Sequence, residues 1–162
     1  MKKPMKIFLL VVIVIAWACP TVRAGILQTE SYNGHIYYLL EEDTWYNSEA
    51  EAVSLGGHLV TINDAAEDAW VYNTFKGKVE DILGVGAYGG SLWIGFHDQD
   101  RDHTWEWISG EPVTYINWAP GQPEGSINEI FSGIFIGDWW VAGGSGKWHD
   151  IVDPEADWDR VF

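Results

Sequence analysis

The stretch from Trp93 to Asp150 constrains the fold most, because large aromatic residues recur in it between glycines, prolines and acidic residues. Its centre, Thr104 to Glu124, reads TWEWISGEPVTYINWAPGQPE. The separated aromatic positions are Trp93, Trp105, Trp107, Trp118 and Trp148. Such spacing is typical of short strands and ordered loops around a small aromatic core, so we expect core positions for the first four of these tryptophans. The polar, acidic loop GQPEGSINE that follows Trp118 is then the place where this core would support a site.

Residues 1–24 have the pattern of a secretory signal peptide. Lysines precede an apolar run, Ile7 to Ala18, that is too short to span a membrane with these flanks. A small-residue signal predicts cleavage after Ala24, which leaves residues 25–162 as a domain that is secreted, periplasmic or held at the cell surface. A retained anchor and lipidation at Cys19 are the alternatives, and the neighbours of Cys19 match a lipoprotein signal poorly.

The expected mature domain is strongly acidic. The chain has 9 basic and 24 acidic residues, and residues 1–24 hold four of the basic residues and no acidic one, which leaves a net charge of about −19. A surface of this sign repels nucleic acid and anionic membranes, so we expect neither as a partner and no membrane insertion after cleavage. Cys19 is the only cysteine, so the mature domain is expected to be free of disulfides.

The local patterns predict an α+β domain with two helices ahead of a series of short strands. Ser31 to Leu40 is an edge strand or hairpin with Asn33-Gly34 as its turn. Thr44 to Leu55 is a helix capped by its first residue, and Asp64 to about Phe75 is a second helix that begins with a capping box. Lys76 to Gly90 is expected to be a loop. The expected strands are His58–Ile62, Leu92–Phe96, Thr104–Ile108, Ile130–Ile136 and Lys147–Ile151.

Five segments occur in a characteristic order: GHIYYLL from Gly34, TWYNSEAEAVSLGGHLVTI from Thr44, WIGF from Trp93, the tryptophan-rich stretch from Thr104, and GKWHD from Gly146. In this order and spacing they resemble the C-type lectin-like domain, in the form found in exported bacterial proteins, over about Tyr32 to Asp150. The resemblance implies a double-looped fold in which N- and C-terminal strands pair and a long loop carries calcium and sugar sites.

The chain departs from the family pattern in two ways. The family's paired cysteines are absent, and Ala52 and Ile130 stand at two of their positions. The family's closing strand follows the segment that GKWHD resembles, and this chain reaches Phe162 where that strand would begin. We therefore expect a disulfide-free member whose final strand is either shortened or truncated, which would expose an edge of the first strand.

The resemblance also implies a ligand site in the long loop. Its expected ligand-binding residues are Gln122, Glu124, Asn128, Glu129, Trp140, His149 and Asp150. All but Trp140 and His149 are expected to bind calcium, through oxygen atoms that suit a hard cation, with a cis peptide bond at Pro123. Asn128 and Glu129 compete for one position, because Asn128 fits the family's spacing and Glu129 is the better ligand chemically. Trp140 would stack on the apolar face of a sugar.

His149 stands where the family has an asparagine. An imidazole nitrogen is a poor ligand for calcium and a better one for a transition metal. Three interpretations are open: His149 points away and leaves a weakened calcium site, it turns the site toward another metal, or the site is lost and the loop contacts protein. We expect a secreted module that binds glycans or glycoconjugates and depends on calcium through the long loop. A metal-independent protein-binding or adhesion module on the same fold is the alternative.

A second acidic group, Asp98, Asp100 and Asp102, has the alternation of a calcium-binding loop but lacks its glycine and closing glutamate. We expect an acidic, solvated turn there, although the family can carry an auxiliary calcium site at Asp98 and Asp102.

The sequence has no Ser-His-Asp order, nucleophile elbow, phosphate loop or zinc-spaced histidine pair. We therefore expect no enzymatic activity.

Overall fold

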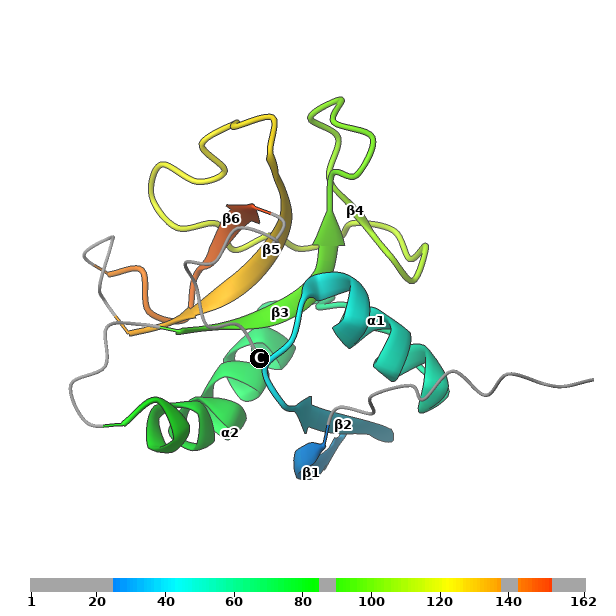
Figure 1. Cartoon of the computed structure of the whole chain (residues 1–162). Coiled ribbons are helices and arrows are strands. Elements are labelled where there is room, and N and C mark those ends of the chain that lie inside the picture. Colours follow the sequence, from blue (N-terminus) through cyan, green and yellow to red (C-terminus); the bar gives the residue numbers. More distant parts are fainter. Residues whose placement is uncertain (1–24, 85–89, 138–142, 153–162) are drawn as a thin grey trace, which may run out of the picture.

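Two helices and two antiparallel sheets make up the chain over residues 25–84, 90–137 and 143–152, the part that the computed structural model describes (Figure 1). The elements in chain order are β1 (Ile26–Tyr32), β2 (His35–Leu40), α1 (Trp45–Ser54), α2 (Ala65–Leu83), β3 (Gly90–His97), β4 (Glu106–Trp107), β5 (Glu129–Ile136) and β6 (Trp148–Val152). β1 and β2 form one sheet, and β4, β3, β5 and β6 form the other in that spatial order. The predicted α+β class is confirmed. Neither helix of this part has the length and hydropathy of a membrane span, and the predicted signal peptide lies outside it.

The hairpin predicted from Asn33-Gly34 is present, and it packs on α2. These two turn residues have φ angles of 48° and 86°, which asparagine and glycine adopt more readily than other residues. The ring of Tyr32 stacks on Trp70 of α2 with centroids 4.6 Å apart, and Tyr37 meets the same ring edge-on at 4.8 Å. Within the described residues β2 pairs with β1 alone, and the expected closing strand would fall in residues 153–162, beyond that part.

Both helices begin at the caps that the sequence predicts. The hydroxyl of Thr44 accepts the backbone N–H of Asn47 at 3.2 Å, at the start of α1. The carboxylate of Asp64 accepts the N–H groups of Ala66 and Glu67 at 2.8 and 2.9 Å, at the start of α2. These bonds satisfy donors that have no partner within the helix, which fixes where each helix starts.

α2 runs to Leu83, so the prediction of a loop from Lys76 is wrong. The buried face of the helix continues past the predicted end, because Phe75 is followed one turn later by Val79, which is fully buried. Burial of a valine side chain stabilises by about 1.5–3 kcal/mol. This outweighs the ~1 kcal/mol that an exposed helical glycine such as Gly77 costs.

The predicted strand His58–Ile62 is absent, although the segment lies beside β3. The Gly95 N–H donates to the Val60 carbonyl at 2.9 Å, while the Gly95 carbonyl accepts the Ile108 N–H at 2.8 Å. This edge of β3 is therefore divided between two short segments. For the same reason the expected strand Thr104–Ile108 is reduced to the two residues of β4.

Replacing Gly95 with alanine is expected to destabilise the domain by about 2 kcal/mol. An added Cβ atom would lie 2.8 Å from the Leu59 carbonyl oxygen and 2.9 Å from Ile108 Cγ2, so backbone would have to shift. Urea unfolding measures the loss. The matched control is Gly77→Ala on α2, where the methyl group meets nothing within 4 Å and should stabilise by about 0.5–1 kcal/mol. Equal effects of the two substitutions would contradict the close contact at Gly95.

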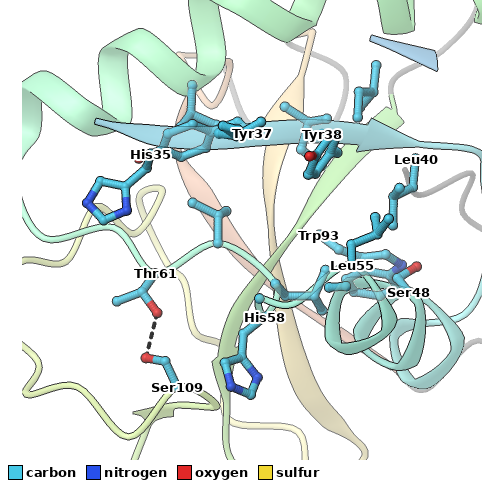
Figure 2. Close-up of a pocket in the computed structure, with 18 of the residues that line it drawn as sticks. His35, Tyr37, Tyr38, Leu40, Ser48, Leu55, His58, Thr61, Trp93 and Ser109 are labelled. Carbon is cyan, nitrogen blue, oxygen red and sulfur yellow. Dashed lines mark hydrogen bonds between the residues drawn. The ribbon is translucent and has the colours of Figure 1, made fainter. Parts of the chain in front are cut away.

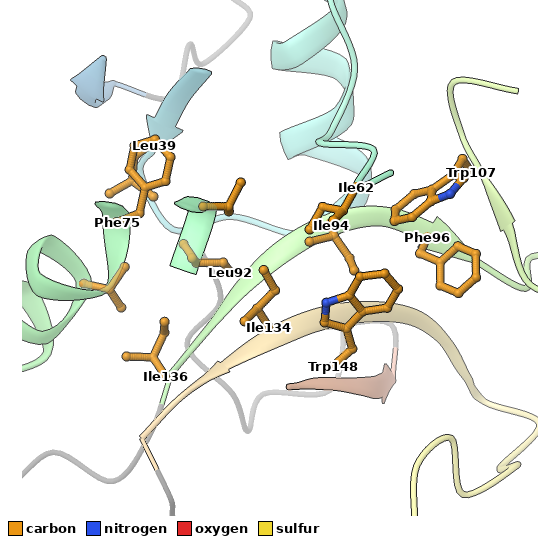
Figure 3. Close-up of a cluster of buried hydrophobic side chains, with 12 residues drawn as sticks. Leu39, Ile62, Phe75, Leu92, Ile94, Phe96, Trp107, Ile134, Ile136 and Trp148 are labelled. Atoms are coloured by element: carbon orange, nitrogen blue, oxygen red, sulfur yellow. The ribbon is translucent and has the colours of Figure 1, made fainter. Parts of the chain in front are cut away.

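The core surrounds β3 and β5, which are buried along almost their whole length (Figure 3). The main cluster contains Leu39, Ile62, Val71, Phe75, Val79, Leu92, Ile94, Phe96, Trp107, Ile134, Ile136 and Trp148. A smaller cluster contains Trp45, Trp93, Ile130, Phe131 and Ile151. Trp93 and Trp107 are buried as predicted, and Trp105 and Trp118 pack half-buried against the main cluster. The aromatic residues thus form the scaffold from which the loops extend.

Candidate functional site

The long loop (residues 108–128) runs beside β6 before it reaches β5. The Trp148 N–H donates to the Asn117 carbonyl, and the Ala119 N–H donates to the Trp148 carbonyl, each at 2.8 Å. These bonds make a parallel bridge between Trp118 and Trp148. The bridge sets the register of the loop against the strand, so residues just beyond the two tryptophans are brought close together.

Gln122 and Glu124 of the loop meet Asp150 of β6. The backbone N–H of Glu124 donates to both carboxylate oxygens of Asp150, at 3.0 and 3.2 Å. The Asp150 N–H in turn donates to Gln122 Oε1 at 3.4 Å. The peptide bond between Gln122 and Pro123 is cis, as the resemblance implies. The structure therefore brings together the loop residues and the strand residue that were expected to share a site.

Glu129, the first residue of β5, belongs to the same group. Burial raises the pKa of its carboxyl group, and the charges of Asp150 and Glu124 raise it further, to about 7. Its Oε2 atom is buried and has no hydrogen-bond partner in the described part of the chain. Asn128, the alternative ligand, is exposed. We name the group formed by Gln122, Glu124, Glu129 and Asp150 the loop site.

The loop site is a set of oxygen atoms that carries excess negative charge. Burial also raises the pKa of Asp150, and backbone N–H groups, that of Glu124 foremost, oppose this shift. The charge of Glu124 therefore raises the pKa of both Glu129 and Asp150, and the charge of Asp150 also raises that of Glu129. Calcium binds oxygen ligands and would reduce the repulsion between carboxylates, so these residues fit the ion that the resemblance implies.

His149, expected among the ligand-binding residues, is not part of the loop site. Its ring stacks on Phe135 with centroids 3.6 Å apart, and its Nε2 atom lies 2.7 Å from the Ser91 hydroxyl oxygen. Burial lowers the pKa of the imidazole to about 3, so the ring is neutral at physiological pH. Adjacent residues of a strand point to opposite faces, which places this ring across β6 from Asp150. Of the three interpretations, the geometry favours the one in which His149 points away. Trp140 lies outside the described residues.

The second acidic group forms an ordered turn after β3. The buried carboxylate of Asp98 accepts the backbone N–H groups of Asp102 and His103, each at 3.1 Å. Carboxylate oxygens of Asp98, Asp100 and Asp102 lie within 4.8 Å of one another, a spacing that could hold a cation. Asp100 and Asp102 are exposed, in agreement with the expected acidic turn. These two hydrogen bonds to Asp98 stabilise the geometry of the turn.

A groove of about 640 Å³ lies between β2 and the segment that follows α1 (Figure 2). The hydroxyl groups of Thr61 and Ser109 are hydrogen-bonded at 2.7 Å in its wall, and core residues such as Phe75 and Trp93 line it. β2 lines the groove along its length, and the resemblance implies a closing strand at this hairpin. Because residues 153–162 lie beyond the described part, we assign no ligand to the groove.

Two residues behind the loop site are not among those predicted from the sequence, Asp68 of α2 and Asn117 of the long loop. Asp68 is buried and accepts hydrogen bonds from Trp148, Asn117 and Tyr115. A signal for it exists in the sequence, since Asp68 shares the buried face of α2 with Val71, one turn later. Carboxylates are rarely buried without partners, so an acidic residue on such a face indicates a specific hydrogen-bonding role.

Comparison with known proteins gives one family. Residues 41–154 match the family model of the lectin C-type domain. The perlucin-like protein of Mytilus galloprovincialis is 28% identical over 125 residues, which cover 76% of this chain and 72% of that protein. Human lithostathine-1-alpha is 30% identical over 125 residues, which cover 76% of this chain and 68% of that protein. The crystal structure of the C-type lectin CEL-I from Cucumaria echinata matches with a TM-score of 0.61 at 28% identity, over 77% of this chain and 86% of that one. The chain therefore belongs to the C-type lectin domain family, a family of binding proteins.

Proposed function

We propose that this protein is an exported carbohydrate-binding module whose loop site holds calcium and, through it, a sugar. One observation carries the proposal. The Oε2 atom of Glu129 is buried without a hydrogen-bond partner in the described residues, next to the carboxylates of Asp150 and Glu124. A cation would satisfy this atom and offset the crowded charge. Calcium bound there would offer its remaining coordination positions to neighbouring hydroxyl groups of a sugar. The relation to CEL-I, a lectin by name, supports a sugar as the ligand.

Calcium is expected to raise the melting temperature of chelator-treated protein and to be required for glycan binding. A ligand that binds only the folded state stabilises it by ~2.7 kcal/mol at a free concentration about 100 times its Kd. Thermal melts and isothermal titration test the ion, and a glycan array with and without chelator tests the sugar. Asp150→Asn should lose the calcium response, whereas Asp81→Asn, an exposed carboxylate on α2, should keep it. Absence of both heat and thermal shift in the wild type would rule out the calcium site.

We propose further that residues 1–24 direct export and that residues 25–162 form the mature domain. The basic start, the apolar run and the small residues at the end of the first segment support this. Mass spectrometry of the exported protein should give an N-terminus at Gly25. An exported protein that retains Met1 would contradict the cleavage.

A second candidate function is metal-independent protein binding or adhesion. It is favoured by the apolar side chains of Val113, Ile116 and Ile127 in the long loop, which are 44%, 56% and 60% exposed. Exposed apolar side chains in a loop are available for contacts with other proteins. Competition separates the two functions: a lectin is displaced by free monosaccharide and by chelator, and a protein-binding module is indifferent to both.

A further inference from the structure

One buried carboxylate of α2 is hydrogen-bonded to both chain segments that carry the loop site. Asp68 Oδ1 accepts the indole N–H of Trp148, on β6, at 2.8 Å. Its Oδ2 accepts the side-chain amide of Asn117 at 2.5 Å and the hydroxyl of Tyr115 at 3.3 Å, and both donors lie in the long loop. Asp68 is not itself a member of the loop site, so it can influence that site only through these partners.

Asn117 is held by further bonds to the residues that lead into β6. Its side-chain amide also donates to the Gly146 carbonyl at 3.1 Å, and its Oδ1 accepts the ammonium group of Lys147 at 2.5 Å. Its backbone carbonyl accepts the Trp148 N–H at 2.8 Å. With Asp68 on its remaining side, Asn117 ties the base of the long loop to the start of β6 in one conformation.

This connection lies close to the loop site along both chain segments. Trp148 precedes Asp150 by two residues on β6, and the Trp148 carbonyl accepts the Ala119 N–H at 2.8 Å. Further along the loop, Glu124 donates its N–H to Asp150. A shift of the loop along β6 would therefore break the bonds at Asp68 and the bonds at Asp150 together.

We propose that Asp68 is a positioning residue for the loop site, which fixes the register between the long loop and β6 so that Glu124 stays against Asp150. The role of that site in ligand binding rests on the proposed function. Burial raises the pKa of Asp68, and the hydrogen bonds from Trp148 and Asn117 oppose this shift. Burying a carboxylate is unfavourable in itself, and an apolar side chain could not make the directional bonds that this one makes to two separate segments.

Asp68→Asn tests the proposal because it keeps the volume of the side chain and replaces one acceptor oxygen with a donor. The new NH₂ group would face either the indole N–H of Trp148 or the amide of Asn117. Hydrogen exchange of the Ala119 and Glu124 amides is expected to accelerate by about 10-fold, while the amides of the β3–β5 pairing keep their rates. In the same variant the affinity for calcium alone is expected to fall about 10-fold, as happens when a residue behind metal ligands is changed.

The reciprocal exchange, Asp68→Asn combined with Asn117→Asp, is the sharper test. Each single substitution places two like groups against each other. In the doubly substituted protein an amide at position 68 again faces a carboxylate at position 117, with Lys147 still beside it, and only the hydrogen bond from position 117 to the Gly146 carbonyl is lost. We expect the exchange rates of Ala119 and Glu124 to return part of the way from those of Asp68→Asn to those of the wild type, which a loss of stability alone would not produce.

Val79→Ala, in the buried face of the same helix about three turns further on, is the control for stability. It should lower the melting temperature without selectively accelerating hydrogen exchange of the Ala119 and Glu124 amides. If Asp68→Asn accelerates exchange uniformly, or if the reciprocal exchange gives no recovery, Asp68 is a structural residue only and the proposal is wrong. A wild type that binds no calcium would refute the proposed function, and the exchange rates would still decide the role of Asp68.

Discussion

Trp148→Ala is expected to lower the free energy of unfolding by about 4 kcal/mol. The indole is fully buried, and the rings of Phe96, Trp107 and Tyr115 lie around it with centroids 5.6, 5.7 and 5.7 Å away. Its removal opens a cavity among these rings and takes away the donor that lies 2.8 Å from Asp68. Domains are stable by only about 5–15 kcal/mol, so the variant should lose a large part of its stability. Urea unfolding followed by circular dichroism measures the loss.

Trp148→Phe separates the packing of this side chain from its hydrogen bond. Phenylalanine keeps an aromatic ring among its neighbours but leaves Asp68 Oδ1 without the indole N–H, which should cost about 1–3 kcal/mol. Equal losses for alanine and phenylalanine would mean that the hydrogen bond dominates. A loss below about 1 kcal/mol for alanine would contradict a central place for Trp148 in the core.

The scaffold was predictable where its signals are local. Asn33-Gly34 can form a tight turn whatever surrounds it, and Thr44 and Asp64 satisfy the first N–H groups of their own helices. Trp93 and Trp107 are large and apolar, and a small domain has few places for such side chains other than its core. The structural roles of these residues can therefore be predicted from the residue type and its immediate neighbours.

The errors arose where distant contacts decide the structure. The extent of α2 past Lys76 depends on Val79 meeting a core that other elements build. The segment His58–Ile62 has strand-forming residues, but it shares the edge of β3 with β4. The sequence of the segment does not indicate that another segment pairs with the same edge. Such outcomes follow from the tertiary arrangement and not from local propensity.

In the candidate site, some features follow from local sequence signals and others from contacts between distant segments. Gln122 and Glu124 lie near Asp150 because the bridge at Trp118 aligns loop and strand, which the order of motifs implies. The orientation of the His149 side chain could have been predicted from the sequence, because two adjacent residues on one strand point to opposite faces. The imidazole and the carboxylate at these positions therefore had to separate.

Glu129→Gln is expected to stabilise the calcium-free protein at about pH 8 and to abolish its response to calcium. The pKa of Glu129 is about 7 in the folded protein, against an ordinary value of 4.5. As the pH rises from about 4.5 to about 7, the unfolded chain releases the proton before the folded chain does. The free energy of unfolding therefore falls, and this loss of stability is complete above about pH 7. Below about pH 4.5 both states are protonated and the group contributes nothing. Glutamine does not ionise, so the variant avoids the loss.

The expected gain is about 3 °C in melting temperature at about pH 8, which corresponds to ~1 kcal/mol after allowance for the solvent exposure of this carboxyl group. At about pH 4 the two proteins should melt together. Glu80→Gln, which removes an exposed carboxylate of α2, is the matched control and should change the melting temperature at neither pH. With calcium present, the wild type should melt at a higher temperature than the variant. The wild type gains the binding energy of the ion, whereas the variant lacks one of the carboxylate ligands. If Glu129→Gln instead lowers the stability of the chelated protein at about pH 8, the neighbouring carboxylates do not crowd Glu129, and the reason to place a cation among them disappears.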